Sequence, residues 1–189
     1  MTVILNDKCS NFIKLIKNFK GIIMNHIVLS FIGRDQAGLV NTLSHTIKKH
    51  HGNWQTSSMH NLSGFFTGII EIAVEESHSQ NLISALNDIE ALCCQIEVAT
   101  HDSENQPANL VLALTANDRS GIIQDISSVI HQQGGNLVKL VSTQESAAYS
   151  GQLMFIAKAK VCVNDNNVAN LVSAIEGIAD DIMVDILKD

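Results

Sequence analysis

The chain has 189 residues, of which 46% are hydrophobic, 16% charged and 4% aromatic, and its formal net charge is −7. This composition excludes intrinsic disorder, because a chain so apolar and so weakly charged can bury a core. The sequence contains no window of about 18 uninterrupted apolar residues, so it does not indicate a membrane span. From Met24 onward eight Lys and Arg stand against 18 Asp and Glu, a formal charge of −10, so we expect no direct binding of nucleic acid, which needs clustered cations.

The segment that precedes Met24 differs from the rest of the chain. The stretch 12–20 places apolar residues at roughly helical spacing with lysines between them, which is typical of a basic amphipathic helix at a membrane surface or a partner. It does not resemble a secretory signal, because lysines interrupt its apolar run. The simpler interpretation is that the native protein starts at Met24 and that the segment 1–23 is an extension.

The remainder of the chain is a tandem repeat. When His26 is placed on Asn109, the segment 26–72 aligns with 109–155 without a gap. Glycines and polar residues are the informative identities, because special backbone conformations restrict them. These identities are Asp35/Asp118, Gly38/Gly121, Gly52/Gly135, Asn53/Asn136 and Gly68/Gly151. We therefore predict two domains, 24–100 and 109–189, joined by a polar linker over 101–108 that contains the only proline.

The first copy begins with a strand over 27–32, whose apolar residues on both sides predict burial on both faces. An amphipathic helix follows over 39–47 and ends near Gly52. Two strands, 53–62 and 65–74, are joined by a tight turn at Ser63 and Gly64. A second helix over 82–89 and a strand over 94–98 complete the copy.

The second copy shows the same order of elements. Its strands are predicted at 110–115, 136–145, 151–163 and 182–186, and its helices at 122–130 and 168–175. The order βαββαβ, present twice, predicts an α+β fold. In each domain a four-stranded antiparallel sheet would carry two helices on one face.

The turn from the first strand into the first helix is the most informative loop in each copy. Gly38 and Gly121 let the backbone approach a small ligand closely, and the free N–H groups of the helix start can hold a carboxylate. Asp35 and Asp118, which precede these glycines, could accept hydrogen bonds from an ammonium group. An α-amino acid supplies both charges. The alternative interpretation is that the two aspartates cap their helices.

The pattern Asp-x-x-Gly-Leu/Ile-Val/Ile after an apolar strand, followed by a helix and Gly-Asn, resembles the ACT domain, an amino-acid-sensing ferredoxin-like module. The resemblance covers essentially everything after Met24 and implies that a small amino acid binds at an interface between copies. Ala37 and Ser120 stand where ACT domains often carry proline. Carried over by position, the resemblance implies ligand contacts from Asp35, Gln36, Ala37, Gly38, Asn53, Asp118, Arg119, Ser120, Gly121 and Asn136.

Two ACT copies without an attached enzyme resemble the transcriptional repressors of glycine cleavage genes. This resemblance implies a non-enzymatic regulator that senses a small amino acid, glycine above all, and binds a LysR-type transcriptional activator instead of DNA. A detached regulatory subunit of a metabolic enzyme is the alternative within the binding class. Pairing of the two copies within one chain and homodimerisation through sheet edges both stay open.

An enzyme is the rival class, because the stretch 33–38 superficially resembles the anion loop of acylphosphatases. That family also needs an arginine at the helix start, and the stretch 39–43 supplies none. Cofactors and metals are not expected, since Cys9, Cys93, Cys94 and Cys162 contain no Cys-x-x-Cys pair and the eight histidines are scattered. The cysteines favour reduced thiols in a cytoplasmic protein.

Overall fold

The computed structural model describes residues 23–99 and 107–187, which fall into two compact units. The predicted basic helix at 12–20 and most of the predicted linker lie outside the described residues. The elements of the first unit are β1 (Met24–Arg34), α2 (Leu39–Lys49), β2 (Asn53–Leu62), β3 (Phe65–Glu75), α3 (Glu76–Asn87) and β4 (Cys93–Ala99). Those of the second are β5 (Leu110–Asn117), α4 (Ile122–Gln132), β6 (Asn136–Ser146), β7 (Leu153–Cys162), a 3-10 turn η1 (Asp165–Asn167), α5 (Val168–Glu176) and β8 (Met183–Leu187). The predicted order βαββαβ is thus confirmed in both copies.

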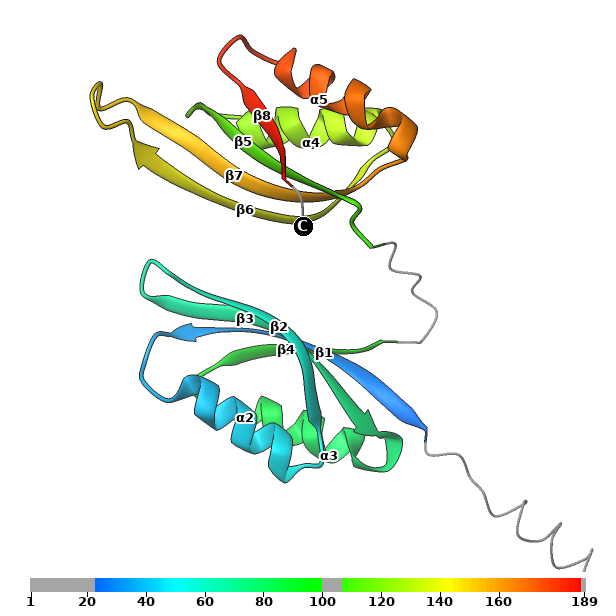
Figure 1. The fold of residues 1–189 in the computed structure, drawn as a ribbon. Helices are drawn as coiled ribbons and strands as arrows, with labels where there is room; N and C mark the ends of the chain where they lie inside the picture. The colour runs from blue at the N-terminus through cyan, green and yellow to red at the C-terminus, as the bar shows by residue number, and fades with distance from the viewer. Residues whose placement is uncertain (1–22, 100–106, 188–189) are drawn as a thin grey trace, which may run out of the picture. The chain divides into compact units, whose positions relative to one another are not determined.

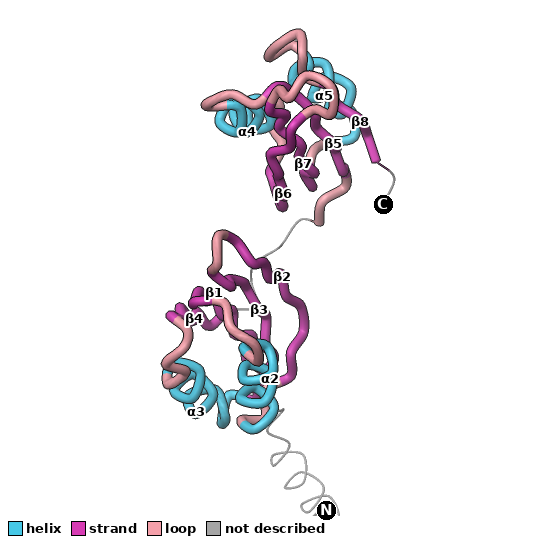
Figure 2. The backbone as a smooth tube through the Cα atoms, turned by 90° about the vertical axis from the view of Figure 1, so that its left-hand side faces the viewer, coloured by secondary structure: helices cyan, strands magenta, loops and turns pink. Residues whose placement is uncertain are grey.

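Each unit is a four-stranded sheet with both of its helices on one face (Figure 1). The strand order is β2-β3-β1-β4 in the first unit and β6-β7-β5-β8 in the second, with every neighbouring pair antiparallel. The backbone trace shows how helices and strands separate into two layers in each unit (Figure 2). The first strand of each copy is therefore central, and the loop that follows it emerges beside the first helix.

The core of each unit lies between its sheet and its helices. In the first unit Ile27, Leu29 and Phe31 are buried against Leu43 and other residues of the helical stripe. In the second unit residues of the same pattern on β5 and β7 pack against α4 and α5. We call the sheet face that turns away from the helices the open face.

The expectation that the first strand is buried on both faces is wrong. Ile32 on the open face of β1 is 47% exposed, and Val28 and Ser30 are only half-buried. Alternate residues of a strand point to opposite faces, and the helices cover only one of them. The open face of the first unit is therefore available for contacts.

The ungapped alignment of the two copies holds only as far as the hairpin. The alignment places Leu29 on Leu112. Leu29 pairs with Ile70 and Leu112 pairs with Ala159, so the structure equates Ile70 with Ala159. The alignment without a gap would instead place Ile70 on Leu153. Gly68 lies within β3, but Gly151 lies in the β6–β7 turn, so their identity in that alignment is not a structural equivalence. The second hairpin is longer because it carries the extra residues.

Both edge strands that follow the first helix are bulged at the same place. The pairing register of β2 with β3 shifts between Trp54 and Thr56, and that of β6 with β7 shifts between Leu137 and Lys139. A bulge adds one residue to one strand, twists it and interrupts its regular hydrogen bonding. These strands therefore do not present a regular outer edge.

Candidate functional site

The loop between β1 and α2 is shaped by Gly38 and by Asp35. Gly38 has φ +95°, a left-handed conformation that favours glycine, and it occupies the N-cap position directly before α2. The Asp35 N–H donates to the carbonyl of Gly64 at 3.0 Å, and the Asp35 carboxylate accepts a hydrogen bond from the side-chain amide of Asn61. The loop is thus anchored to the β2–β3 hairpin at two points.

The equivalent loop of the second unit repeats this arrangement. Gly121 has φ +89°, the Asp118 N–H donates to the carbonyl of Leu153 at 2.9 Å, and the Asp118 carboxylate accepts from the Gln144 amide. The capping interpretation of the two aspartates is therefore wrong: a glycine occupies each cap position, and both carboxylates point to the neighbouring hairpin.

One loop residue of the second unit has an additional partner. Arg119 Nη2 lies 2.7 Å from Asp125 Oδ2, with both side chains about two-fifths exposed. An exposed ion pair of this kind contributes little to stability. It does, however, direct the guanidinium toward α4, a constraint that the first unit lacks because Gln36 stands at the equivalent position.

A small pocket of about 140 Å³ lies beside the first of these loops. Three predicted site residues, Asp35, Gln36 and Gly38, line it, but Ala37 does not. The remaining lining residues are Leu39, Val40, Asn41 and Phe66. Phe66 could not be placed here from sequence, because its position depends on the pairing of Gly33 with β3.

The first turn of α2 lines this pocket and contains backbone N–H groups that have no acceptor within the helix. The first backbone hydrogen bond of the helix runs from the Thr42 N–H to the Gly38 carbonyl at 2.9 Å. The N–H groups of Leu39, Val40 and Asn41 therefore have no acceptor within the helix. A pocket that combines such donors with a carboxylate can hold a small molecule with separated negative and positive charges.

Asn53 and Asn136 are not brought to these loops within their own units. Asn53 lies in the row of Ala73 and His26, while the loop follows Arg34 at the other end of β1. The span from His26 to Arg34 corresponds to about 26 Å along a strand. Asn136 pairs with Cys162, likewise at the end of the sheet remote from Asp118.

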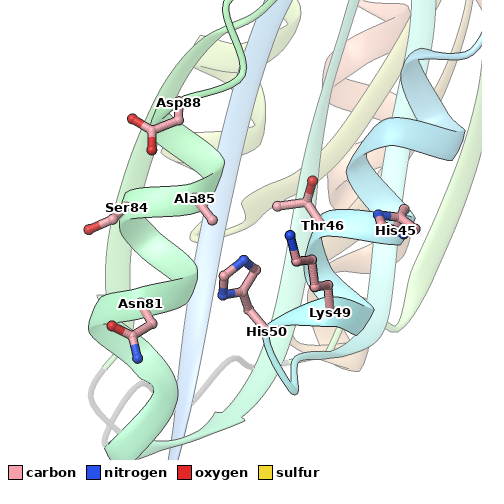
Figure 3. Close-up of a pocket in the computed structure, with 8 residues that line it drawn as sticks. All are labelled: His45, Thr46, Lys49, His50, Asn81, Ser84, Ala85 and Asp88. Carbon is pink, nitrogen blue, oxygen red and sulfur yellow. The ribbon is translucent and has the colours of Figure 1, made fainter.

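A larger groove of about 520 Å³ lies between α2 and α3 and was not predicted. Lys49 and His50 point into it, as Figure 3 shows, and Asn81 lines it from α3. The other lining residues are His45, Thr46, Ser84, Ala85 and Asp88. Its lining can hydrogen bond a polar partner. No pattern in the sequence indicates this groove, because its residues come from two helices that are far apart in the chain.

The described residues contain no candidate metal site. No group of three or more His, Cys, Asp or Glu in this part of the chain could hold a metal ion. Burial raises the pKa of the Cys94 thiol, and the neighbouring Cys93 raises it further, so Cys94 is not an activated nucleophile. Within the same residues, no helix is long and apolar enough to cross a membrane.

The first unit can be compared with a known family. Residues 25–98 match the family of the ACT domain. This match covers the first unit, and the second unit repeats the same order of strands and helices, so the chain carries the ACT fold twice.

Two solved structures share this arrangement over most of the chain. An unknown protein from Galdieria sulphuraria is 23% identical with a TM-score of 0.74, and the match covers 87% of this chain and 98% of that protein. A candidate glycine cleavage system transcriptional repressor is 14% identical with a TM-score of 0.67, covering 88% of this chain and 99% of that protein. At these identities the likeness establishes the fold. No curated protein matches the sequence.

Proposed function

We propose that the chain is a non-enzymatic regulator that senses a small amino acid, glycine above all, and restrains transcription of glycine cleavage genes. In this proposal it binds a LysR-type activator in the cytoplasm instead of binding DNA itself. The acidic composition and the absence of a cationic stripe from the sequence are consistent with action through a protein partner. The fold shared with a candidate glycine cleavage repressor supports the same assignment.

The observation that carries the proposal is the pocket at the β1–α2 loop. The Asp35 carboxylate accepts one hydrogen bond from Asn61 and keeps further lone pairs for an ammonium group. The first-turn N–H groups of α2 can bind a carboxylate across the pocket. A volume of about 140 Å³ suits an amino acid with a small side chain or none.

We assign amino-acid binding to the first unit, where Gln36 takes the place of the ion-paired Arg119. Gln36 and Gly38 would contact the ligand together with Asp35. The contacts of Asn53 and Asn136 that the family resemblance implies stay predictions.

The test is a thermal-shift and calorimetric titration of the full chain with glycine, alanine, serine and leucine. Glycine at about 100 times its Kd should stabilise the first unit by about 2.7 kcal/mol. Asp35→Asn should abolish the shift by removing the charge that faces the ammonium group. Asp118→Asn, the matched change in the second unit, should retain it. No shift with any amino acid would refute the sensor.

The partner is tested separately by capture of a purified LysR-type activator on the immobilised chain. Glycine at millimolar concentration should weaken capture, and the activator should weaken glycine binding by the same factor, because coupling between two sites is reciprocal. Capture that is unaffected by glycine in a chain that binds glycine would exclude this mechanism while leaving the amino-acid site intact.

A further inference from the structure

The lysines of the second unit are concentrated on its open face. Lys160 pairs with both Lys139 and Val111, and residues directly opposite each other on neighbouring strands share a face. Their neighbours Leu112 and Ala159 are fully buried on the helix side, so the lysines point away from the helices. All lysines in the described part of this unit lie on this face: Lys139, Lys158 and Lys160.

The open face of the first unit carries acidic residues at the equivalent row. Val28 pairs with Glu71 on one side and with Glu97 on the other. Val28 corresponds to Val111, so their partners on β3 and β7, Glu71 and Lys160, correspond as well. The same row of the same sheet is therefore acidic in one unit and basic in the other, although the two copies share their fold.

Exposed apolar side chains accompany the charges on both faces. Ile32 and Ile69 are 47% and 49% exposed on the first unit, and Val141 and Met183 are 44% and 65% exposed on the second. Their strand pairing places them on the open faces. Antiparallel sheets pack face to face at about 10 Å through such surfaces, and exposed apolar patches often mark protein contacts.

We propose that two copies of the chain dimerise through these faces. The acidic open face of the first unit of one copy docks on the lysine-bearing open face of the second unit of the other copy. Docking of like faces would oppose lysine to lysine or glutamate to glutamate, which is repulsive. Because the copies are identical, the contact occurs twice around a twofold axis. This interface is independent of amino-acid sensing.

The test is sedimentation velocity on the full chain over a concentration series at physiological salt. The wild type should dimerise. The double variant Lys139→Glu/Lys158→Glu and the double variant Glu71→Lys/Glu97→Lys should each raise the dimer Kd at least tenfold, because each sets like charges against each other. The fourfold variant that combines them should dimerise again, since two lysines of one face and two glutamates of the other have then exchanged their charges.

Each control reverses one charge of the same type at an exposed helix position. Lys48→Glu on α2 and Glu176→Lys on α5 should leave the dimer Kd within twofold of wild type. Circular dichroism checks that every variant is folded. A chain that is monomeric at all concentrations overturns the proposal. So does a dimer that tolerates either double reversal, or one that the fourfold variant does not restore.

Discussion

The side-chain amide of Asn61 donates a hydrogen bond to the carboxylate of Asp35, 26 residues earlier in the chain. Gln144 and Asp118 form the same bond at the same separation in the second unit. The aspartate that the ligand hypothesis requires is thus oriented by the second strand of its own sheet and not by the helix that follows it. A preset carboxylate loses less conformational entropy when it binds a ligand.

Removal of this amide should loosen the loop. We expect Asn61→Ala to lower the free energy of unfolding of the first unit by about 1 kcal/mol, the usual net value of a hydrogen bond, and to weaken glycine binding. Urea denaturation followed by the fluorescence of Trp54, the only tryptophan, measures the stability. Gln55→Ala is the matched control, because this amide of the same strand makes only a 3.4 Å bond to the Asn53 carbonyl. Equal losses in the two variants would contradict the assignment.

Two glycines, Gly33 near the end of β1 and Gly38 at the end of the loop, should respond differently to alanine. A Cβ on Gly38 would meet no atom within 4 Å, so Gly38→Ala is opposed only by its left-handed backbone, at about 1 kcal/mol. A Cβ on Gly33 would lie 2.3 Å from the Ala91 carbonyl oxygen, a backbone atom that cannot move freely. Gly33→Ala should therefore cost more, about 3 kcal/mol. Similar unfolding midpoints for the two variants would refute this explanation.

The two cores are made of different residues, so a substitution in one core should destabilise only the unit that contains it. Leu29→Ala removes a fully buried side chain from the first core and should cost about 2–5 kcal/mol there. Leu112→Ala is its counterpart in the second core. Trp54 fluorescence should shift to lower urea only in the first variant, whereas circular dichroism should detect both. A shift of the Trp54 signal in Leu112→Ala would show that the units unfold together.

The adjacent cysteines should differ in reactivity. Cys93 is exposed, whereas burial raises the pKa of Cys94, so less Cys94 thiolate is present at a given pH. Alkylation by iodoacetamide, followed by mass spectrometry over a series of increasingly alkaline buffers, should modify Cys93 first. The rate at Cys94 should rise only at higher pH. In urea, where burial is lost, the difference should largely disappear, and persistence there would show that burial is not its cause.

The fold could be predicted because the apolar pattern, and the glycines between its segments, repeat along the chain. A run of apolar residues predicted β1, and the spacing of Leu39, Leu43 and Ile47 predicted α2. The ungapped alignment nevertheless equated Gly68 with Gly151. An insertion in a turn is not detected in such an alignment when both segments contain a glycine at the matching position. Strand pairing identifies the insertion, since register is fixed by which residues share a buried face.

The candidate site could be predicted only where it is local in sequence. Asp35, Gln36 and Gly38 lie in one loop and do line one pocket. Asn61 and Phe66 contribute through pairing across the sheet, which no spacing in the chain encodes. Asn61 is polar and Phe66 is aromatic, and neither belongs to a sequence motif that indicates a binding site. The groove between α2 and α3 was not predicted for the same reason.

The bulges in β2 and β6 lie in edge strands, and they affect whether a further strand can pair with these edges of the two sheets. A straight border with every second N–H and C=O available is a template for strand addition, the first step in fibre growth. At Gln55 and Val138 the chain carries an unpaired extra residue, which twists the border out of line. Both units should therefore resist aggregation through these strands, and deletion of Gln55 or Val138 should make the protein more prone to form fibrils.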